Sequence, residues 1–316
     1  ANLSAFYDGH KNTMGPGVGV KNADPSIKIV IAGLASPFIG VDYIKGMIDW
    51  CKEFRGYRPD GSVNLCWDVV NYHFYPDNAS STQDGTGTRG VAPEVSTAGV
   101  VTEKFIQLAQ KESQDMPVWM SETGYDVNQG SPLKAIAIGN KSVLQTQADW
   151  ILRNALFYAR KGIERVYFYQ TYDYDINNPT QFGSSGLLNN NQTRKPAADF
   201  LYQTNRQFGQ YTYKETLQND PIIDRYELNG KSAYALVIPD ETGRTGSATL
   251  NLGSATSAKI YTPTIGRDTM NVELVSTTQG QLTVTVTETP IFIVASDSFF
   301  CRTTFSTSAR VARFGE

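Results

Sequence analysis

The sequence predicts a mixed α/β protein in which an all-β module follows a region of alternating strands and helices. Over about the first 210 residues, apolar runs of strand length alternate four times with segments of helical periodicity. Such alternation is typical of parallel strands joined by helical crossovers. From about residue 211 the pattern changes to short β-like runs separated by turns. Asn229-Gly230, between two of these runs, is a strong hairpin signal.

The elements of the first region are expected in a regular order. Strands are predicted at residues 27–34, 69–75, 117–121 and 165–171. Helices are predicted at residues 42–54, 97–111, 142–161 and 195–208. The first strand is continuously apolar, as expected for a strand buried on both faces. Gly162 is a natural C-cap for the third helix, and Pro196 occupies a first-turn position of the last.

The all-β module is expected to contain seven short strands. They are predicted at residues 222–228, 233–238, 248–252, 258–262, 272–275, 282–287 and 291–294. The domain division that follows is 1–210 for the α/β region and 211–296 for the β module. Residues 297–316 fit neither pattern and are predicted to form an edge segment or a tail.

Composition and charge exclude several classes of protein. With 40% hydrophobic and 19% charged residues, the chain can form a core, and global disorder is not expected. The 28 Lys and Arg against 31 Asp and Glu argue against a nucleic-acid-binding surface. No apolar run approaches the roughly 18–20 residues of a membrane span, and no signal peptide opens the chain at Ala1.

The aromatic content points to carbohydrate, and the cysteines and histidines argue against a metal site. The 17 Tyr, 15 Phe and 4 Trp are typical of extracellular carbohydrate-handling proteins. Cys51, Cys66 and Cys301 lack CxxC spacing, and two histidines are too few for a His-rich site. We therefore expect no metal and no cofactor. Cys51 and Cys66 form either a pair of buried free thiols or a disulfide.

Polar and aromatic side chains gather where three predicted strands end. These strand ends read NYHFYP, WMSETGYD and YQTYDYD, and a long polar loop at residues 77–90 follows the first. In parallel α/β folds, ligands bind at the carboxyl ends of the strands. Glu122 is the most informative residue because it emerges from an apolar run. Desolvating a carboxylate costs free energy, so such a residue needs a partner or a task.

The ordered motifs resemble those of clan A glycoside hydrolases, which are retaining enzymes on a (β/α)8 barrel. WMSETGYD resembles their seventh strand, VVNYHFYPD their sixth and VYFYQTYDYD their eighth. GVGVKNADPSIKIVIAGLA is similar to the helix and fifth strand, and GLLNNNQTRKPAADFLYQ to the helix that closes the barrel. The resemblance covers about residues 10–295. It implies the second half of a TIM barrel, strands five to eight, followed by a β-sandwich domain.

The resemblance also implies roles for individual residues. Retaining hydrolysis uses two carboxyl groups about 5 Å apart, one as nucleophile and one as acid/base. Glu122 would be the nucleophile, oriented by His73 or Tyr75. The residues expected to contact substrate are Tyr125, Asp126, Gln170, Tyr172 and Asp173.

The acid/base residue of the clan is missing from this chain. In clan A it is a Glu that follows an Asn, and no Asn-Glu pair occurs in the sequence. Four strand–helix units cannot close an eight-stranded barrel, and an open half would expose strand edges. We therefore expect a C-terminal piece of a longer polypeptide, or a chain that a companion completes. The implied activity is hydrolysis of a β-linked poly- or oligosaccharide by a secreted, periplasmic or cell-surface protein.

Alternative interpretations remain open for the protein and for its residues. The chain could be a non-catalytic sugar-binding or structural surface protein on a degenerate hydrolase scaffold. An unrelated α/β domain would leave the ordered motifs unexplained. Glu122 could instead be an ion-paired surface residue, and His73 a structural histidine. Asp173 and Asp175 are equally compatible with solvated turn residues. The sequence does not select a sugar or linkage.

Overall fold

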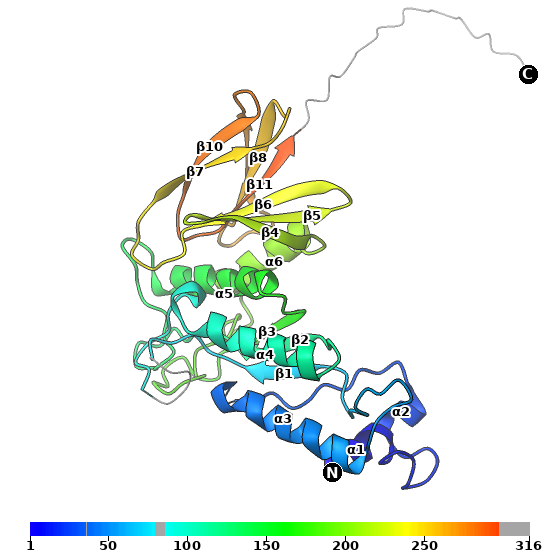
Figure 1. The fold of residues 1–316 in the computed structure, drawn as a ribbon. Coiled ribbons are helices and arrows are strands. Elements are labelled where there is room, and N and C mark those ends of the chain that lie inside the picture. Colours follow the sequence, from blue (N-terminus) through cyan, green and yellow to red (C-terminus); the bar gives the residue numbers. More distant parts are fainter. Residues whose placement is uncertain (36, 80–85, 297–316) are drawn as a thin grey trace, which may run out of the picture.

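The structure is a computed structural model that describes residues 1–35, 37–79 and 86–296, without the side chains of residues 37 and 38. The predicted final segment, 297–316, lies outside the described residues. Figure 1 shows an α/β region at one end of the molecule and an all-β region at the other. Two helices, α5 (Val143–Arg160) and α6 (Pro196–Phe208), lie between them.

The α/β region is built on a parallel sheet with the strand order β1-β2-β3. Its strands are β1 (Val70–His73), β2 (Val118–Thr123) and β3 (Arg165–Phe168). The other helical elements are α1 (Asn2–Asp8), α2 (Val20–Ala23), α3 (Pro37–Phe54), η1 (Pro93–Val95) and α4 (Ala98–Glu112). Helical crossovers connect the strands, as the alternating pattern predicts.

The predicted strand at residues 27–34 is only partly formed. Val30 and Leu34 make isolated parallel bridges to Val69 and Tyr72. The Ile31 N–H donates to the Val69 carbonyl at 3.2 Å, whereas the Ile29 N–H, just before the first bridge, donates to the Asp68 carboxylate at 2.7 Å. The segment is therefore extended and in the expected place, without a continuous ladder.

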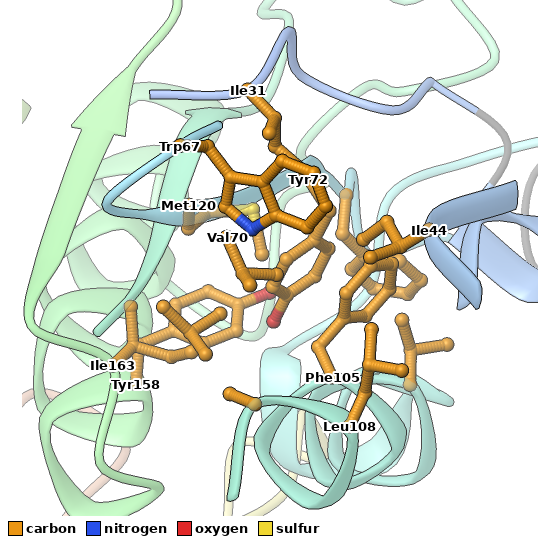
Figure 2. Packing of buried hydrophobic residues seen from close by; sticks show 14 of the residues in the cluster. Ile31, Ile44, Trp67, Val70, Tyr72, Phe105, Leu108, Met120, Tyr158 and Ile163 are labelled. Atoms are coloured by element: carbon orange, nitrogen blue, oxygen red, sulfur yellow. The ribbon is translucent and has the colours of Figure 1, made fainter. Parts of the chain in front are cut away.

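One face of the parallel sheet packs against three helices. Figure 2 shows this core, in which Val70, Tyr72 and Met120 of the sheet meet Phe105 of α4 and Tyr158 of α5. Ile44 and Ile48 of α3 belong to the same cluster. The rings of Tyr72 and Phe105 stack at a centroid distance of 4.2 Å. Since alternate residues of a strand point to opposite faces, Asn71 and Trp119 are directed to the other side of the sheet.

That opposite face is more exposed. The Trp119 and Tyr167 rings lie 5.9 Å apart on it, and the Arg165 guanidinium lies 5.0 Å from the Trp119 ring. Tyr167 is 43% exposed although it occupies the middle of β3. A strand in the interior of a closed barrel would be buried on both faces, so this side of the sheet is open in the described part of the chain.

The all-β region, which we call the β module, comprises two antiparallel sheets. Their orders are β4-β5-β6-β11-β8-β9 and β10-β7. The strands are β4 (Thr212–Asn219), β5 (Ile222–Leu228), β6 (Lys231–Val237), β7 (Gly246–Asn251), β8 (Ser257–Thr262), β9 (Asn271–Ser276), β10 (Gln281–Val286) and β11 (Ile291–Ser296). A buried apolar cluster that includes Leu236, Leu250 and Val284 joins strands of both sheets.

All seven strands expected in this region are confirmed, and the Asn229-Gly230 turn joins β5 to β6 with positive φ at both residues. The strand that sequence reasoning missed is β4, whose residues read TYKETLQN. It is an edge strand and its side chains are mostly exposed or half-buried, so it lacks an apolar signal.

The β module and the α/β region share a hydrophobic core. Trp150 and Ile151 of α5 and Phe200 of α6 lie in one cluster with Tyr226 and Phe292 of the β module.

In the described ranges, no helix has the length and apolar character needed to cross a membrane. The Cys51 and Cys66 thiols are free and buried, with their sulfur atoms 3.9 Å apart.

Candidate active site

A pocket of about 510 Å³ opens where β1 and β2 end. Two carboxylates, Asp77 and Glu122, lie in its lining together with the ring of His73 and the phenol of Tyr75. The remaining lining residues are Ala35, Gly87, Pro132, Leu133, Gln181 and Phe182. The fold thus brings together Glu122, His73 and Tyr75, the three residues predicted to be catalytic, although about fifty residues separate Glu122 from His73 and Tyr75 in the sequence.

An irregularity in strand pairing aims Glu122 at the pocket. Tyr72 pairs with Met120, whereas His73 pairs with Glu122, so β2 carries one extra residue at Ser121. Met120 packs in the helix-side core. In a regular strand, Glu122 would point to the same side as Met120. The extra residue re-aims its carboxylate toward His73, as β-bulges beside active sites commonly do.

Two side chains contact the same oxygen of Glu122. The Tyr75 hydroxyl donates a hydrogen bond to Oε2 at 2.9 Å. His73 Nδ1 lies 3.4 Å from Oε2, and its other ring nitrogen is 2.9 Å from the Ser121 hydroxyl. No hydrogen bond reaches Oε1 from the residues that the structure describes, and the Glu122 side chain is 32% exposed. This oxygen can therefore meet a ligand.

Burial fixes the proton states of the two partners. Desolvation, with the nearby Glu122 carboxylate adding to it, raises the pKa of Tyr75 far above its usual range, so the phenol remains a donor. Desolvation lowers the pKa of His73, and the Glu122 carboxylate opposes this effect only in part. His73 is therefore neutral at neutral pH and places an uncharged ring beside the carboxylate.

A glycine makes room for the histidine. A Cβ atom placed on Gly33 would lie 1.8 Å from Nε2 of His73, so the ring packs directly on the Gly33 backbone. No side chain larger than hydrogen fits there without moving His73. Gly33 belongs to the extended segment beside β1, which thus takes part in building the site.

Tyr125 and Asp126 do not reach the pocket. Both are fully buried. The Tyr125 hydroxyl donates to the Val91 carbonyl at 2.9 Å. Asp126 accepts hydrogen bonds from the Phe182 N–H, the Ser184 N–H and the Ser131 hydroxyl. Because its oxygens hold the segment that carries Phe182, Asp126 supports the pocket wall, and neither Tyr125 nor Asp126 is among the residues that line the pocket.

Asp173 is also a structural residue. Its side chain is 1% exposed, pairs with Nζ of Lys195 at 2.6 Å, and accepts the Gly186 N–H at 2.9 Å. Gln170 is half-buried and donates to the Phe182 carbonyl at 2.8 Å, so it too supports the wall. Tyr172 is 44% exposed and lies outside the pocket lining. Asp173, too, lies outside the pocket lining, and its burial and its partners give it a structural role in the described part of the chain.

Asp77 and Phe182 line the pocket but were not predicted from the sequence as site residues. Asp77 directly follows the strand-end motif, and that position was the signal that could have identified it. Phe182 lies in a loop without a strand-end signal. Its ring contacts those of Tyr75 and Tyr169 at centroid distances of 4.9 and 5.5 Å. Only the folded chain brings Phe182 to the pocket.

Comparison with known proteins identifies the fold. No protein-family model matches the chain, and no curated protein sequence matches it. A solved family 39 glycoside hydrolase from Bacteroides cellulosilyticus is similar in structure, with a TM-score of 0.59 and 17% identity, over 88% of this chain and 52% of that one. The chain thus spans about half of that protein.

Two further solved structures agree with this result. A bifunctional glucanase-xylanase from a metagenome library gives a TM-score of 0.54 at 13% identity, over 88% of this chain and 57% of that one. A family 86 β-porphyranase from Bacteroides plebeius gives 0.52 at 10% identity, over 94% and 52%. The chain therefore has a glycoside-hydrolase-like fold, which confirms the resemblance at that level.

Proposed function

We propose that this chain carries the nucleophile of a retaining O-glycosidase and that Glu122 is that nucleophile. One observation carries the proposal. In a pocket at the carboxyl ends of parallel strands, Tyr75 and His73 contact one oxygen of Glu122, and the other oxygen accepts no hydrogen bond from the described residues. The glycoside-hydrolase-like fold supports the assignment.

The residues present would act as follows. The Glu122 carboxylate attacks the anomeric carbon, the glycosidic C–O bond breaks, and the leaving oxygen takes a proton from an acid. The deprotonated acid then takes a proton from water, the water oxygen bonds to the anomeric carbon, and the bond from that carbon to Glu122 breaks, which restores the carboxylate. Tyr75 holds Oε2 throughout, because its high pKa keeps its proton in place. The neutral His73 ring supports the same oxygen without adding charge.

We propose that a segment outside this chain supplies the acid/base residue and completes a (β/α)8 barrel. The open face around Trp119 and Tyr167 is compatible with further parallel strands, as is the outer edge of β3, which pairs with no other strand among the residues that the structure describes. In this proposal residues 1–210 form the second half of the barrel, and residues 211–296 a β-sandwich domain. The mass of the polypeptide, or complex, isolated from its native source tests this part directly.

The proposed substrate is a β-linked poly- or oligosaccharide. The similar solved structures include a glucanase-xylanase and a β-porphyranase, which act on such polymers. The exposed rings of Tyr172 and Tyr174 offer faces on which sugars could stack. A polymeric substrate of this kind places the protein outside the cytoplasm, in the secreted, periplasmic or cell-surface space.

Hydrolysis of dinitrophenyl β-glycosides tests the proposal. Dinitrophenolate leaves without protonation, so its release as the glycosyl-enzyme forms needs the nucleophile but no general acid. We expect turnover of at least one β-glucoside, β-xyloside or β-galactoside, and a loss of about 1000-fold or more in Glu122→Gln. Glu103→Gln, on the exposed surface of α4, is the matched control. Binding of oligosaccharides without any turnover would instead favour a non-catalytic sugar-binding protein.

A further inference from the structure

We propose that the β module helps to form the active site and that Glu241 of this module is a positioning residue for the site. Glu241 lies in the loop between β6 and β7. Its contacts hold segment 89–92, which pairs with residues 76–78 next to the pocket residues Tyr75 and Asp77. The consequence for sugar binding rests on the proposed function, whereas the positioning itself does not.

Glu241 makes two contacts across the boundary between the two regions. Its Oε1 atom accepts a hydrogen bond from the Arg89 guanidinium at 2.5 Å, and its Oε2 atom accepts the Ala92 N–H at 3.1 Å. A second guanidinium nitrogen of Arg89 donates to the Gly90 carbonyl at 3.0 Å. Glu241 therefore holds both the side chain and the backbone of the segment 89–92.

The loop that carries Glu241 is itself held in place. The carbonyl of Asp240 accepts a hydrogen bond at 2.8 Å from Arg153 of α5, which is fully buried and paired with Glu94 at 2.7 Å. On the other side, the Gly243 N–H donates to Glu288 at 2.6 Å. Because the chain is anchored on both sides of Glu241, at Asp240 and at Gly243, its carboxylate has a defined position.

The segment held by Glu241 is paired with the strand end that enters the pocket. Val91 N–H donates to the Pro76 carbonyl at 3.2 Å, and Asn78 N–H donates to the Arg89 carbonyl at 3.1 Å. Asp77 and Gly90 form an antiparallel bridge between these two contacts. Tyr75 directly precedes Pro76, so a displacement of segment 89–92 would move both Tyr75 and Asp77.

The opposite side of the segment touches another part of the pocket wall. Gly90 N–H donates to the Lys134 carbonyl at 3.0 Å, next to the lining residue Leu133. Segment 89–92 therefore contacts both the strand end that carries Tyr75 and the segment that carries Leu133. A carboxylate that engages a guanidinium and a backbone N–H together constrains geometry more than a simple surface pair does.

Hydrogen exchange followed by mass spectrometry tests the positioning without any sugar. In Glu241→Ala we expect exchange at least several-fold faster in peptides covering residues 76–78 and 88–92. Glu241→Gln, which keeps an acceptor for the Ala92 N–H, should give a smaller increase. Arg89→Gln breaks the same pair from the other side and should reproduce the effect. Glu215→Gln removes a similar carboxylate–arginine pair inside the β module and is the matched control.

Titration with cellohexaose and xylohexaose tests the consequence for the site. Placed in a Glu122→Gln background to prevent hydrolysis, Glu241→Ala should weaken binding about tenfold, and Glu215→Gln should leave it unchanged. Unchanged exchange at residues 76–78 and 88–92, or an increase spread over the whole chain, would overturn the positioning role. Faster exchange with unchanged sugar affinity would overturn the link to the site. Faster exchange in a protein that binds neither hexaose and releases dinitrophenolate from none of the three β-glycosides would uphold the positioning and overturn the proposed function.

Discussion

Tyr75 donates its hydroxyl hydrogen to Oε2 of Glu122 at 2.9 Å, across two neighbouring parallel strands. Tyr75 lies two residues beyond the end of β1 and Glu122 is the second-last residue of β2, and the register shift between Tyr72 and His73 brings the two side chains together. Burial keeps the phenol protonated, so the bond is between a permanent donor and a carboxylate. This pair is the centre of the proposed site.

Tyr75→Phe should reduce turnover without unfolding the protein. A hydrogen bond to a charged group contributes about 1.5–3 kcal/mol, so we expect kcat to fall about 10- to 100-fold. Tyr43→Phe, on the exposed face of α3, should leave kcat unchanged. Steady-state kinetics with dinitrophenyl glycosides, together with melting temperatures, check this. Equal kcat values for Tyr75→Phe and the wild type would show that the bond does not serve catalysis.

Gly33→Ala should displace His73. The added methyl group would lie 1.8 Å from the imidazole Nε2, so the ring must leave both the Ser121 hydroxyl and the Glu122 carboxylate. We expect reduced turnover and a shift in the His73 ring signals in NMR spectra.

Gly46→Ala is the control for that substitution. Gly46 lies inside α3 with open space around the added methyl group. Alanine should stabilise the helix by about 0.5–1 kcal/mol and leave turnover intact. Unaltered His73 signals in Gly33→Ala would contradict the packing described for the site.

His73 should make the folded protein less stable in mild acid. Burial lowers its pKa, so the unfolded chain takes up a proton at higher pH than the folded chain does. The folded state therefore loses stability as the pH falls from about 6.5 toward the lower folded pKa. Melting temperatures near pH 7.5 and pH 5.5 should differ more in the wild type than in His73→Gln. Identical differences would show that His73 does not titrate in this range.

Lys195→Met should strongly destabilise the protein. The Lys195–Asp173 pair is almost fully buried, and burial lowers the pKa of Lys195 while Asp173 opposes the change. Removing one partner leaves an uncompensated buried charge, which typically costs about 3–5 kcal/mol. Denaturant unfolding measures the loss, and the double variant Lys195→Met/Asp173→Leu should recover part of it. A sugar-binding role for Asp173 would instead change KM with little change in stability.

The sequence predicted the elements that have their own apolar pattern. Both boundaries of β5 match the predicted strand, and the helix expected at residues 142–161 is α5. In α5 the Ser142 hydroxyl accepts the Gln145 N–H and the Gln145 side chain accepts the Ser142 N–H, a local signal that needs no tertiary information. Strand β4 has no such pattern, because it lies at a sheet edge among polar residues.

The site was less predictable than the fold. Strand order places Glu122, His73 and Tyr75 at one edge, and periodicity is sufficient to predict this. Periodicity does not reveal that Asp126 turns inward to bind the Ser184 N–H, because the loop at residue 184 is placed by the fold. The contact of Arg89 with Glu241 joins residues 152 positions apart and has no local sequence signal.

The most direct test of the central claim is to trap the covalent intermediate. A dinitrophenyl 2-deoxy-2-fluoro-β-glycoside needs no acid to leave, and its fluorine slows hydrolysis of the glycosyl-enzyme. After digestion and mass spectrometry, we expect one glycosyl group on the peptide that contains Glu122, and none in Glu122→Gln. A glycosyl group attached to another residue, or equal labelling of the wild type and Glu122→Gln, would contradict the account.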